Sequence, residues 1–133
     1  PYLIGIHISE GTNLPSGENI SDIKSIIDKQ LLGVMLSCVS PENFETNLEE
    51  LKNLNVPFGF KINAFVTTKP KNGYSSTFTK SNGNPNEFLG QRKDLTPNKM
   101  SEFAKKFHDS GATILGGCCE TRPAHIKKIS NLK

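Results

Sequence analysis

The sequence predicts an α/β fold in which four strand–helix units build one parallel sheet. Short apolar runs alternate four times with segments of helical periodicity along the 133 residues. This order is typical of parallel sheets with right-handed crossovers. Asparagine or cysteine lies at the end of each of the last three apolar runs, where such folds carry their chemistry.

The composition argues against several classes of function. Hydrophobic residues make up 35% of the chain and charged residues 22%, and the net charge is +3. This small positive excess is scattered, which argues against nucleic-acid binding. No apolar run approaches the roughly 18 residues of a membrane helix, and no basic-then-apolar leader suggests secretion. Three cysteines, an odd number, favour a reducing environment, so we expect a cytoplasmic protein.

The first unit is expected to begin with a strand over residues 2–8, where a nearly continuous apolar run is typical of burial on both faces. A polar loop rich in Gly, Pro and Asn follows. A helix is then expected to end at Gly33, before a second strand over 34–37. The apolar face of this helix consists of Ile20, Ile23, Ile26, Ile27 and Leu31.

The second helix has a strong start at Ser40-Pro41-Glu42, which combines an N-cap, a proline at the first position and an acid near the positive end of the dipole. The apolar face of this second helix consists of Phe44, Leu48, Leu51 and Leu54. A third strand is expected after it, over 57–63.

A segment without clear periodicity covers residues 64–95 and is too long for a plain connector, so we expect a lid, an interface segment or a mobile loop. Thr96-Pro97 opens the third helix, and Ser110-Gly111 closes it. The apolar face of that helix consists of Met100, Phe103, Ala104 and Phe107.

The last strand, expected over 112–115, runs into two glycines and then the adjacent residues Cys118 and Cys119. A final helix follows, with Thr121 as its expected N-cap and a proline in its first turn. Adjacent cysteines do not easily bond to each other, because the small ring would be strained. Flexible glycines can, however, let two thiolates turn toward one metal ion.

Cys38 also lies just past a short apolar strand. Three thiolates at strand ends, with one coordination position left open, are the arrangement of a catalytic zinc site. A single cysteine is more often a small buried hydrophobic residue, but three at strand ends, two of them after Gly-Gly, favour a metal site. A redox or iron–sulfur role remains an alternative that metal analysis decides.

These residues resemble the signatures of the homocysteine S-methyltransferase family. The C-terminal signature is similar to Gly116-Gly-Cys-Cys…Thr121…Pro123…His125-Ile126. The family's glycine–valine…asparagine–cysteine…proline stretch resembles Gly33-Val-Met-Leu-Ser-Cys38…Pro41, and its later asparagine motif resembles Ile62-Asn63-Ala64. The order and spacing agree over essentially the whole chain, but the family's N-terminal half is not covered.

The resemblance implies that residues 1–133 are one domain, the C-terminal half of a (β/α)₈ TIM-type barrel. Four strand–helix units are half of such a barrel, which takes about 250 residues and places catalytic groups at the C-terminal strand ends. A chain that starts at Pro1 directly with a strand also suggests a cut from something longer. Because an isolated half would expose two strand edges, we expect it to need its missing N-terminal half or a partner chain.

The resemblance also implies methyl transfer to the thiol of homocysteine, giving methionine, with Zn²⁺ held by Cys38, Cys118 and Cys119. Zinc would favour the deprotonated substrate thiol. The small-molecule methyl donor stays open among a sulfonium, a quaternary ammonium of the betaine type and a folate. Asn63 is a candidate substrate contact. The fragment alone is expected to be inactive, and the alternative is a non-catalytic zinc-binding fragment or subunit.

His125, in the first turn of the last helix, is expected to make a structural hydrogen bond rather than to bind zinc; His7 and His108 receive no role. The chain departs from the family at two positions. Ser37 precedes Cys38 where the family usually has asparagine, and Glu120 follows the cysteine pair where glycine is commoner, which adds negative charge. Neither departure removes a metal ligand.

Overall fold

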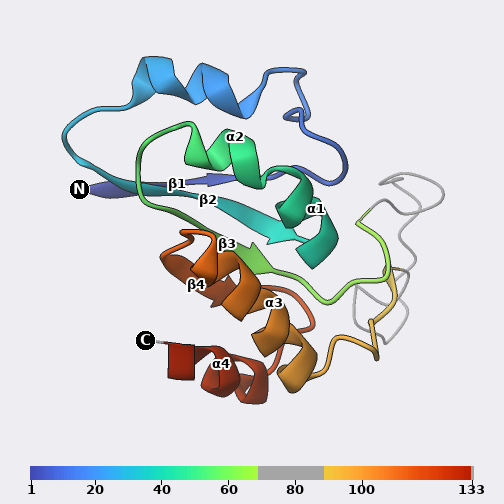
Figure 1. Ribbon diagram of the computed structural model, residues 1–133. Helices are drawn as coiled ribbons and strands as arrows, with labels where there is room; N and C mark the ends of the chain where they lie inside the picture. Colours follow the sequence, from blue (N-terminus) through green and yellow to red (C-terminus); the bar gives the residue numbers. More distant parts are fainter. Residues whose placement is uncertain (69–88, 133) are drawn as a thin grey trace.

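The computed structural model describes residues 1–68 and 89–132 and contains one sheet of four parallel strands (Figure 1). Each strand pairs with the next one along the chain, so the order is β1-β2-β3-β4. The predicted parallel α/β architecture is therefore confirmed. The strands are β1 (Tyr2–Ile6), β2 (Leu31–Val39), β3 (Phe58–Ile62) and β4 (Ile114–Gly117).

Helices connect the strands and cover one face of the sheet. On β3, Phe58, Phe60 and Ile62 are buried against these helices, whereas Lys61 between them is exposed. No helix of the described residues is long and apolar enough to cross a membrane. The helices are η1 (Ile20–Ile26), α1 (Pro41–Thr46), α2 (Leu48–Lys52), α3 (Pro97–Asp109), α4 (Pro123–Ile129) and η3 (Ser130–Leu132).

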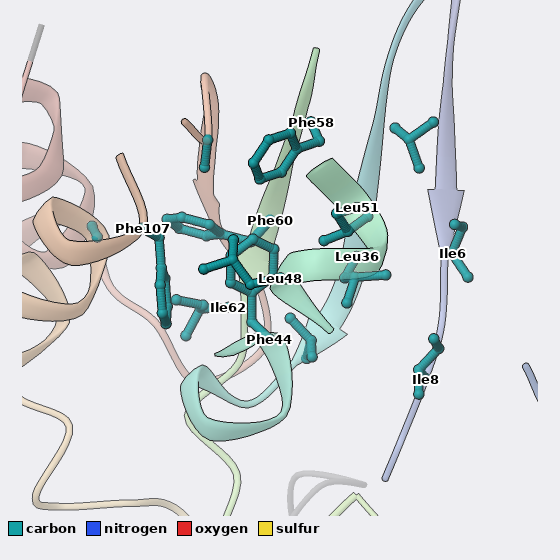
Figure 2. Close-up of a cluster of buried hydrophobic side chains, with 14 of the residues drawn as sticks. Ile6, Ile8, Leu36, Phe44, Leu48, Leu51, Phe58, Phe60, Ile62 and Phe107 are labelled. Carbon is teal, nitrogen blue, oxygen red and sulfur yellow. The ribbon is translucent and has the colours of Figure 1, made fainter. Parts of the chain in front are cut away.

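Three phenylalanines form the centre of the core between the sheet and the helices (Figure 2). Phe44 of α1, Phe60 of β3 and Phe107 of α3 are fully buried. Their ring centroids lie 4.7 to 5.7 Å apart, within the range in which aromatic pairs attract beyond simple area burial. This cluster fixes α1 and α3 on the sheet.

Phe107→Ala is expected to lower the free energy of unfolding by about 3–5 kcal/mol, because it removes a buried ring and leaves a cavity. Phe103 is a matched control on the same helix: it stacks on Phe107 at 6.1 Å but is only half-buried. Phe103→Ala should therefore cost clearly less. Denaturant unfolding of the whole protein measures both variants, and equal losses would contradict this account of the core.

The predicted starts of two helices are confirmed. The hydroxyl of Ser40 accepts a hydrogen bond from the Asn43 amide at 3.1 Å, and Thr96 does the same for Lys99 at 3.2 Å. The predicted apolar face of the second helix is buried throughout, although Asn47 divides that helix into α1 and α2. On α3 the predicted face is buried as well, except for the half-buried Phe103.

The predicted burial of the first strand on both faces does not hold among the described residues. β1 ends at Ile6, and only the face that carries Ile4 and Ile6 turns toward the core. Leu3, on the other face, is 46% exposed. Among the described residues β1 is an edge strand, and no described segment covers its second face, so its apolar pattern overstates its burial here.

The predicted helix over residues 20–31 is also wrong. The helical stretch is a short 3-10 helix, η1, with Ile20 and Ile23 buried but Ile26 60% exposed. Leu31 already belongs to β2, where it pairs with Tyr2. Gly33 does not end a helix. It lies inside β2, where a Cβ would come within 2.6 Å of the Ile114 side chain and of the Pro57 carbonyl.

Of the predicted loop over residues 64–95, the structure describes only the two limbs, residues 64–68 and 89–95. Phe65 and Gln91 form an antiparallel bridge, and the Arg92 amide donates to the Ala64 carbonyl at 2.8 Å. The limbs therefore lie side by side near the end of β3. The prediction of a lid or interface segment concerns mainly residues 69–88, which lie outside the described part of the chain.

Candidate metal centre

The three cysteines meet at the carboxyl edge of the sheet. Cys38 lies at the end of β2, and Cys118 and Cys119 follow β4 directly. Their sulfur atoms all lie within 4.8 Å of one another. The Sγ atom of Cys119 is 3.9 Å from that of Cys38 and 3.8 Å from that of Cys118. Residues 80 positions apart thus form one half-buried cluster, because the carboxyl ends of parallel strands share an edge.

A β-bulge turns Cys38 toward this cluster. Ser37 pairs with Lys61 and Val39 with Ile62, so Cys38 is an extra residue between two regular pairs. Its φ of 58° lies in the left-handed region, which costs a residue other than glycine about 1–2 kcal/mol. Bulges of this kind re-aim a side chain beside a functional site. Periodicity in the sequence gives no sign of the bulge.

Asn63 holds the bulge from β3. This side chain is fully buried. Its Nδ2 donates to the Cys38 carbonyl at 2.6 Å and lies 3.7 Å from the Cys38 sulfur, while its Oδ1 accepts from the Phe65 amide. Both ends of the amide therefore already have partners in the protein. A contact of Asn63 with substrate remains a prediction.

The cysteine pair lies in a tight turn after β4. The Cys118 amide donates to the Ile62 carbonyl at 2.7 Å, and the Cys119 carbonyl accepts from the Ala64 amide at 2.9 Å. The hydroxyl of Thr121 donates to the Cys118 carbonyl at 2.6 Å. The preceding glycines belong to β4, which begins two residues later than the sequence predicts. Backbone hydrogen bonds thus join the turn to the end of β3, and the hydroxyl of Thr121 closes the turn itself.

Thr121 is not the N-cap of the last helix, as the sequence predicts; Arg122 is. The hydroxyl of Thr121 is used instead to hold the cysteine turn. The prediction for His125 is confirmed, because its Nδ1 accepts from the Arg122 amide at 2.9 Å and its Nε2 donates to the Leu95 carbonyl at 3.0 Å. His125 therefore has a structural role at the start of α4.

Gly117→Ala is expected to destabilise the protein by about 1–3 kcal/mol and to disturb the cysteine turn, as overpacking does. A Cβ at Gly117 would collide with the Thr121 hydroxyl and come within 2.9 Å of the Ile126 side chain. Gly116→Ala is the matched control, since a Cβ there meets its neighbours only at 3.5 Å and beyond. Unfolding and metal titration of both variants test this contrast, and equal behaviour would contradict it.

Burial is the main influence on the thiols. It raises the pKa of Cys38 to about 12, and the neighbouring thiols Cys118 and Cys119 add to this shift. Burial also raises the pKa of Cys119, with Cys118 as the next cause. Without a cation both thiols therefore stay protonated at neutral pH. A bound cation reverses this balance because it attracts thiolates.

Metal affinity is consequently expected to rise with pH. Metal binding must release one proton from each thiol with a raised pKa, Cys38 and Cys119. Both pKa values lie above the ordinary value of 9.0. Between pH 6 and 8 the apparent affinity should thus increase about a hundredfold or more per pH unit. Competition titrations against a chelator measure this slope, and an affinity that does not change with pH would contradict it.

The sulfur triangle fits a tetrahedral zinc ion. Zinc–sulfur bonds of about 2.3 Å in a tetrahedron place neighbouring sulfurs ~3.8 Å apart. The two measured separations, 3.8 and 3.9 Å, match this edge. Three ligands also leave the fourth tetrahedral position free for a substrate atom. In the described part of the chain these cysteines are the one group of His, Cys, Asp and Glu residues so arranged.

A parallel α/β sheet with three thiols at its carboxyl edge defines the class of this protein. The sequence model of the homocysteine S-methyltransferase family matches residues 1–132. The chain belongs to the homocysteine S-methyltransferase family, as its motifs predict.

Curated relatives and a solved structure agree with this membership. Homocysteine S-methyltransferase 1 of Saccharomyces cerevisiae is 28% identical, with 98% of this chain and 39% of the relative covered. The protein of the same name from Brassica oleracea var. italica is 25% identical over 91% of this chain and 34% of its own length. The fold is similar to the crystal structure of the homocysteine methyltransferase MmuM from Escherichia coli in its metallated form. That match has a TM-score of 0.65 at 16% identity and covers 98% of this chain and 35% of that one. The chain spans about a third of the length of the curated relatives it matches.

Proposed function

We propose that the whole protein transfers a methyl group to the thiol of homocysteine, giving methionine, at a zinc ion held by Cys38, Cys118 and Cys119. The observation that carries this proposal is the sulfur triangle, whose two edges at Cys119 match the sulfur spacing around tetrahedral zinc. Family membership supports the reaction. The names of the relatives support the acceptor, since several of them, from plants, yeast and Bacillus subtilis, are homocysteine S-methyltransferases.

Each part of the site has a task in this reaction. When bound, Zn²⁺ favours the ionised form of a thiol and so supplies a nucleophile at neutral pH. The three cysteines fix the cation at the strand ends and leave one position for the substrate sulfur. Asn63 keeps Cys38 in its bulged conformation, and Thr121 keeps the Cys118 turn closed. These groups position sulfur atoms and do not themselves react.

We further propose that residues 1–133 are one domain, the C-terminal half of a (β/α)₈ barrel, with β1 to β4 as its fifth to eighth strands. The likeness to a solved homologue over 98% of this chain but 35% of that one supports this. So does the sheet face opposite the helices, which carries apolar groups that the described residues leave partly open. Leu3, Met35 and Ile114 are examples.

The missing N-terminal half, or a partner chain that replaces it, covers this face and completes the pocket. The methyl donor is bound mainly there, so residues outside this sequence select among a sulfonium, a betaine-type ammonium and a folate. A non-catalytic zinc-binding fragment or subunit is the second candidate function.

Metal analysis and a transfer assay on the purified whole protein test the proposal. We expect about one zinc per chain, no visible absorbance, and methionine formed from homocysteine in the presence of the correct donor. Selenocysteine should be compared as an acceptor, because two relatives are named selenocysteine methyltransferase and selenocysteine Se-methyltransferase. A coloured iron–sulfur cluster would refute the zinc site. Zinc without transfer to any acceptor would favour the non-catalytic alternative.

A further inference from the structure

We propose that His7 is a positioning residue for Cys38, holding the β-bulge from β1 just as Asn63 holds it from β3. The inference rests on the proposed function, because it assigns His7 a role through the metal-binding sulfur of Cys38. It concerns a residue to which the sequence motifs give no role.

The hydrogen bonds of His7 fix its orientation. His7 follows β1 directly, and the pairing of Ile6 with Leu36 places it beside Ser37. Its Nδ1 lies 3.1 Å from the Ser37 carbonyl oxygen, and its Nε2 lies 2.9 Å from the Ser9 hydroxyl. A carbonyl oxygen only accepts, so Nδ1 carries the proton and the Ser9 hydroxyl donates to Nε2. The Ser9 hydroxyl thus orients the imidazole through Nε2, and Nδ1 donates to the Ser37 carbonyl.

Two consecutive carbonyl groups of the bulge are therefore bound by side chains from the two flanking strands. His7 binds the Ser37 carbonyl, and Asn63 binds the Cys38 carbonyl. A positive φ on a residue other than glycine persists only where its surroundings over-determine it. Together these two hydrogen bonds set the planes of the peptide groups on both sides of the Cys38 Cα.

The packing beside the bulge leaves little freedom on the β1 side. A Cβ at Gly5 would lie 2.9 Å from the Ser37 hydroxyl oxygen, so β1 and Ser37 are in close contact. Rotation of the Ser37 carbonyl away from His7 would turn the Cys38 side chain as well. The sulfur of Cys38 would then leave the separation of 3.9 Å from Cys119 that matches zinc. The hydrogen bond of His7 consequently acts on metal affinity through geometry.

Three variants of the whole protein test the inference. His7→Phe keeps a ring but removes the donor, whereas His7→Asn keeps an N–H group near the position of Nδ1. His108→Phe is the control, because His108 is an exposed histidine on α3, on the helix side of the sheet. The first readout is Co²⁺ affinity, by chelator competition with the thiolate-to-cobalt absorption as signal. The second is hydrogen exchange of residues 36–40 in the metal-free protein.

We expect His7→Phe to lower Co²⁺ affinity roughly tenfold, the lower end for partners that orient metal ligands. Exchange at residues 36–40 should become faster. His7→Asn should restore both readouts, and His108→Phe should change neither. If His7→Phe does not fold, His7→Ala takes its place in the same comparison.

Several outcomes would overturn the inference. Wild-type affinity and exchange in His7→Phe would show that the hydrogen bond does not position Cys38. Wild-type behaviour in His7→Phe together with a loss in His7→Asn would show that the ring acts by its bulk, and a loss in both variants would show that an N–H group near the position of Nδ1 is not what positions Cys38. If even the wild type binds no Co²⁺, the proposed metal site fails, but the contrast in hydrogen exchange between the Phe and Asn variants still decides the role of His7.

Discussion

Replacing Cys119 by serine is expected to abolish metal retention and methyl transfer while leaving the fold intact. The sulfur of Cys119 lies 3.8 to 3.9 Å from both other sulfurs. A serine hydroxyl is nearly the same size but stays protonated at neutral pH, and zinc binds deprotonated ligands. The apparent zinc affinity should therefore fall by at least about a hundredfold, since each ligand supplies a large share of the binding free energy.

Metal content after dialysis against a weak chelator and the initial rate of methionine formation measure this loss. Cys38→Ser and Cys118→Ser should show losses of similar size. Ser37→Ala is the matched control, because it removes a hydroxyl next to the site but keeps the backbone carbonyl that His7 binds. A Cys119→Ser protein that still holds one zinc per chain would contradict the assignment of the three ligands.

The meeting of the cysteines could be predicted because it depends only on strand order and direction. Cys38 and the pair Cys118-Cys119 each follow a short apolar run, and parallel strands bring their carboxyl ends to one edge. No knowledge of side-chain contacts is needed for this step. The same reasoning located Asn63 at the neighbouring strand end, between the two cysteine-bearing strands.

The way in which each sulfur is aimed could not be predicted. The bulge at Cys38 adds one residue to β2 and leaves no mark in the apolar pattern. The hydrogen bonds that Asn63 and His7 make to it depend on tertiary contacts across neighbouring strands. Thr121 fits an N-cap by its residue type, but the Cys118 carbonyl takes its hydroxyl instead. Local sequence preferences do not reveal such competition between partners.

The misjudged elements share a second physical cause. The pattern of β1 is that of a strand buried on both sides, and its exposed Leu3 suits a larger sheet than the described one. Gly33 is of a residue type that often ends helices, but here it allows neighbouring strands to approach closely. At Gly33 the sequence carries information about neighbours that are distant along the chain, and at β1 it agrees with the barrel that we propose. Periodicity within one segment cannot distinguish these from local signals.

Residues 1–133 expressed alone are expected to be inactive in methyl transfer and to associate with one another. In the described part of the chain the sheet has two free edges, at β1 and at β4, and an apolar face opposite the helices. Free edges and exposed apolar strands favour pairing with other chains. With the pocket incomplete, the substrate cannot be oriented, so the rate should fall at least about a hundredfold relative to the whole protein.

Two substitutions test whether the face of β1 that carries Leu3 is covered in the whole protein. Leu3→Lys places a charge on the open face of β1 and should destabilise the whole protein by several kcal/mol, because a buried charge without a partner is costly. Ile26→Lys is the control: Ile26 is even more exposed but lies on η1, on the helix side. That change should be nearly neutral.

Light scattering, the transfer assay and denaturant unfolding give the readouts for both predictions. If residues 1–133 formed a monomer that unfolds cooperatively and transfers methyl groups, or if both lysine variants behaved alike, the half-barrel proposal would be wrong.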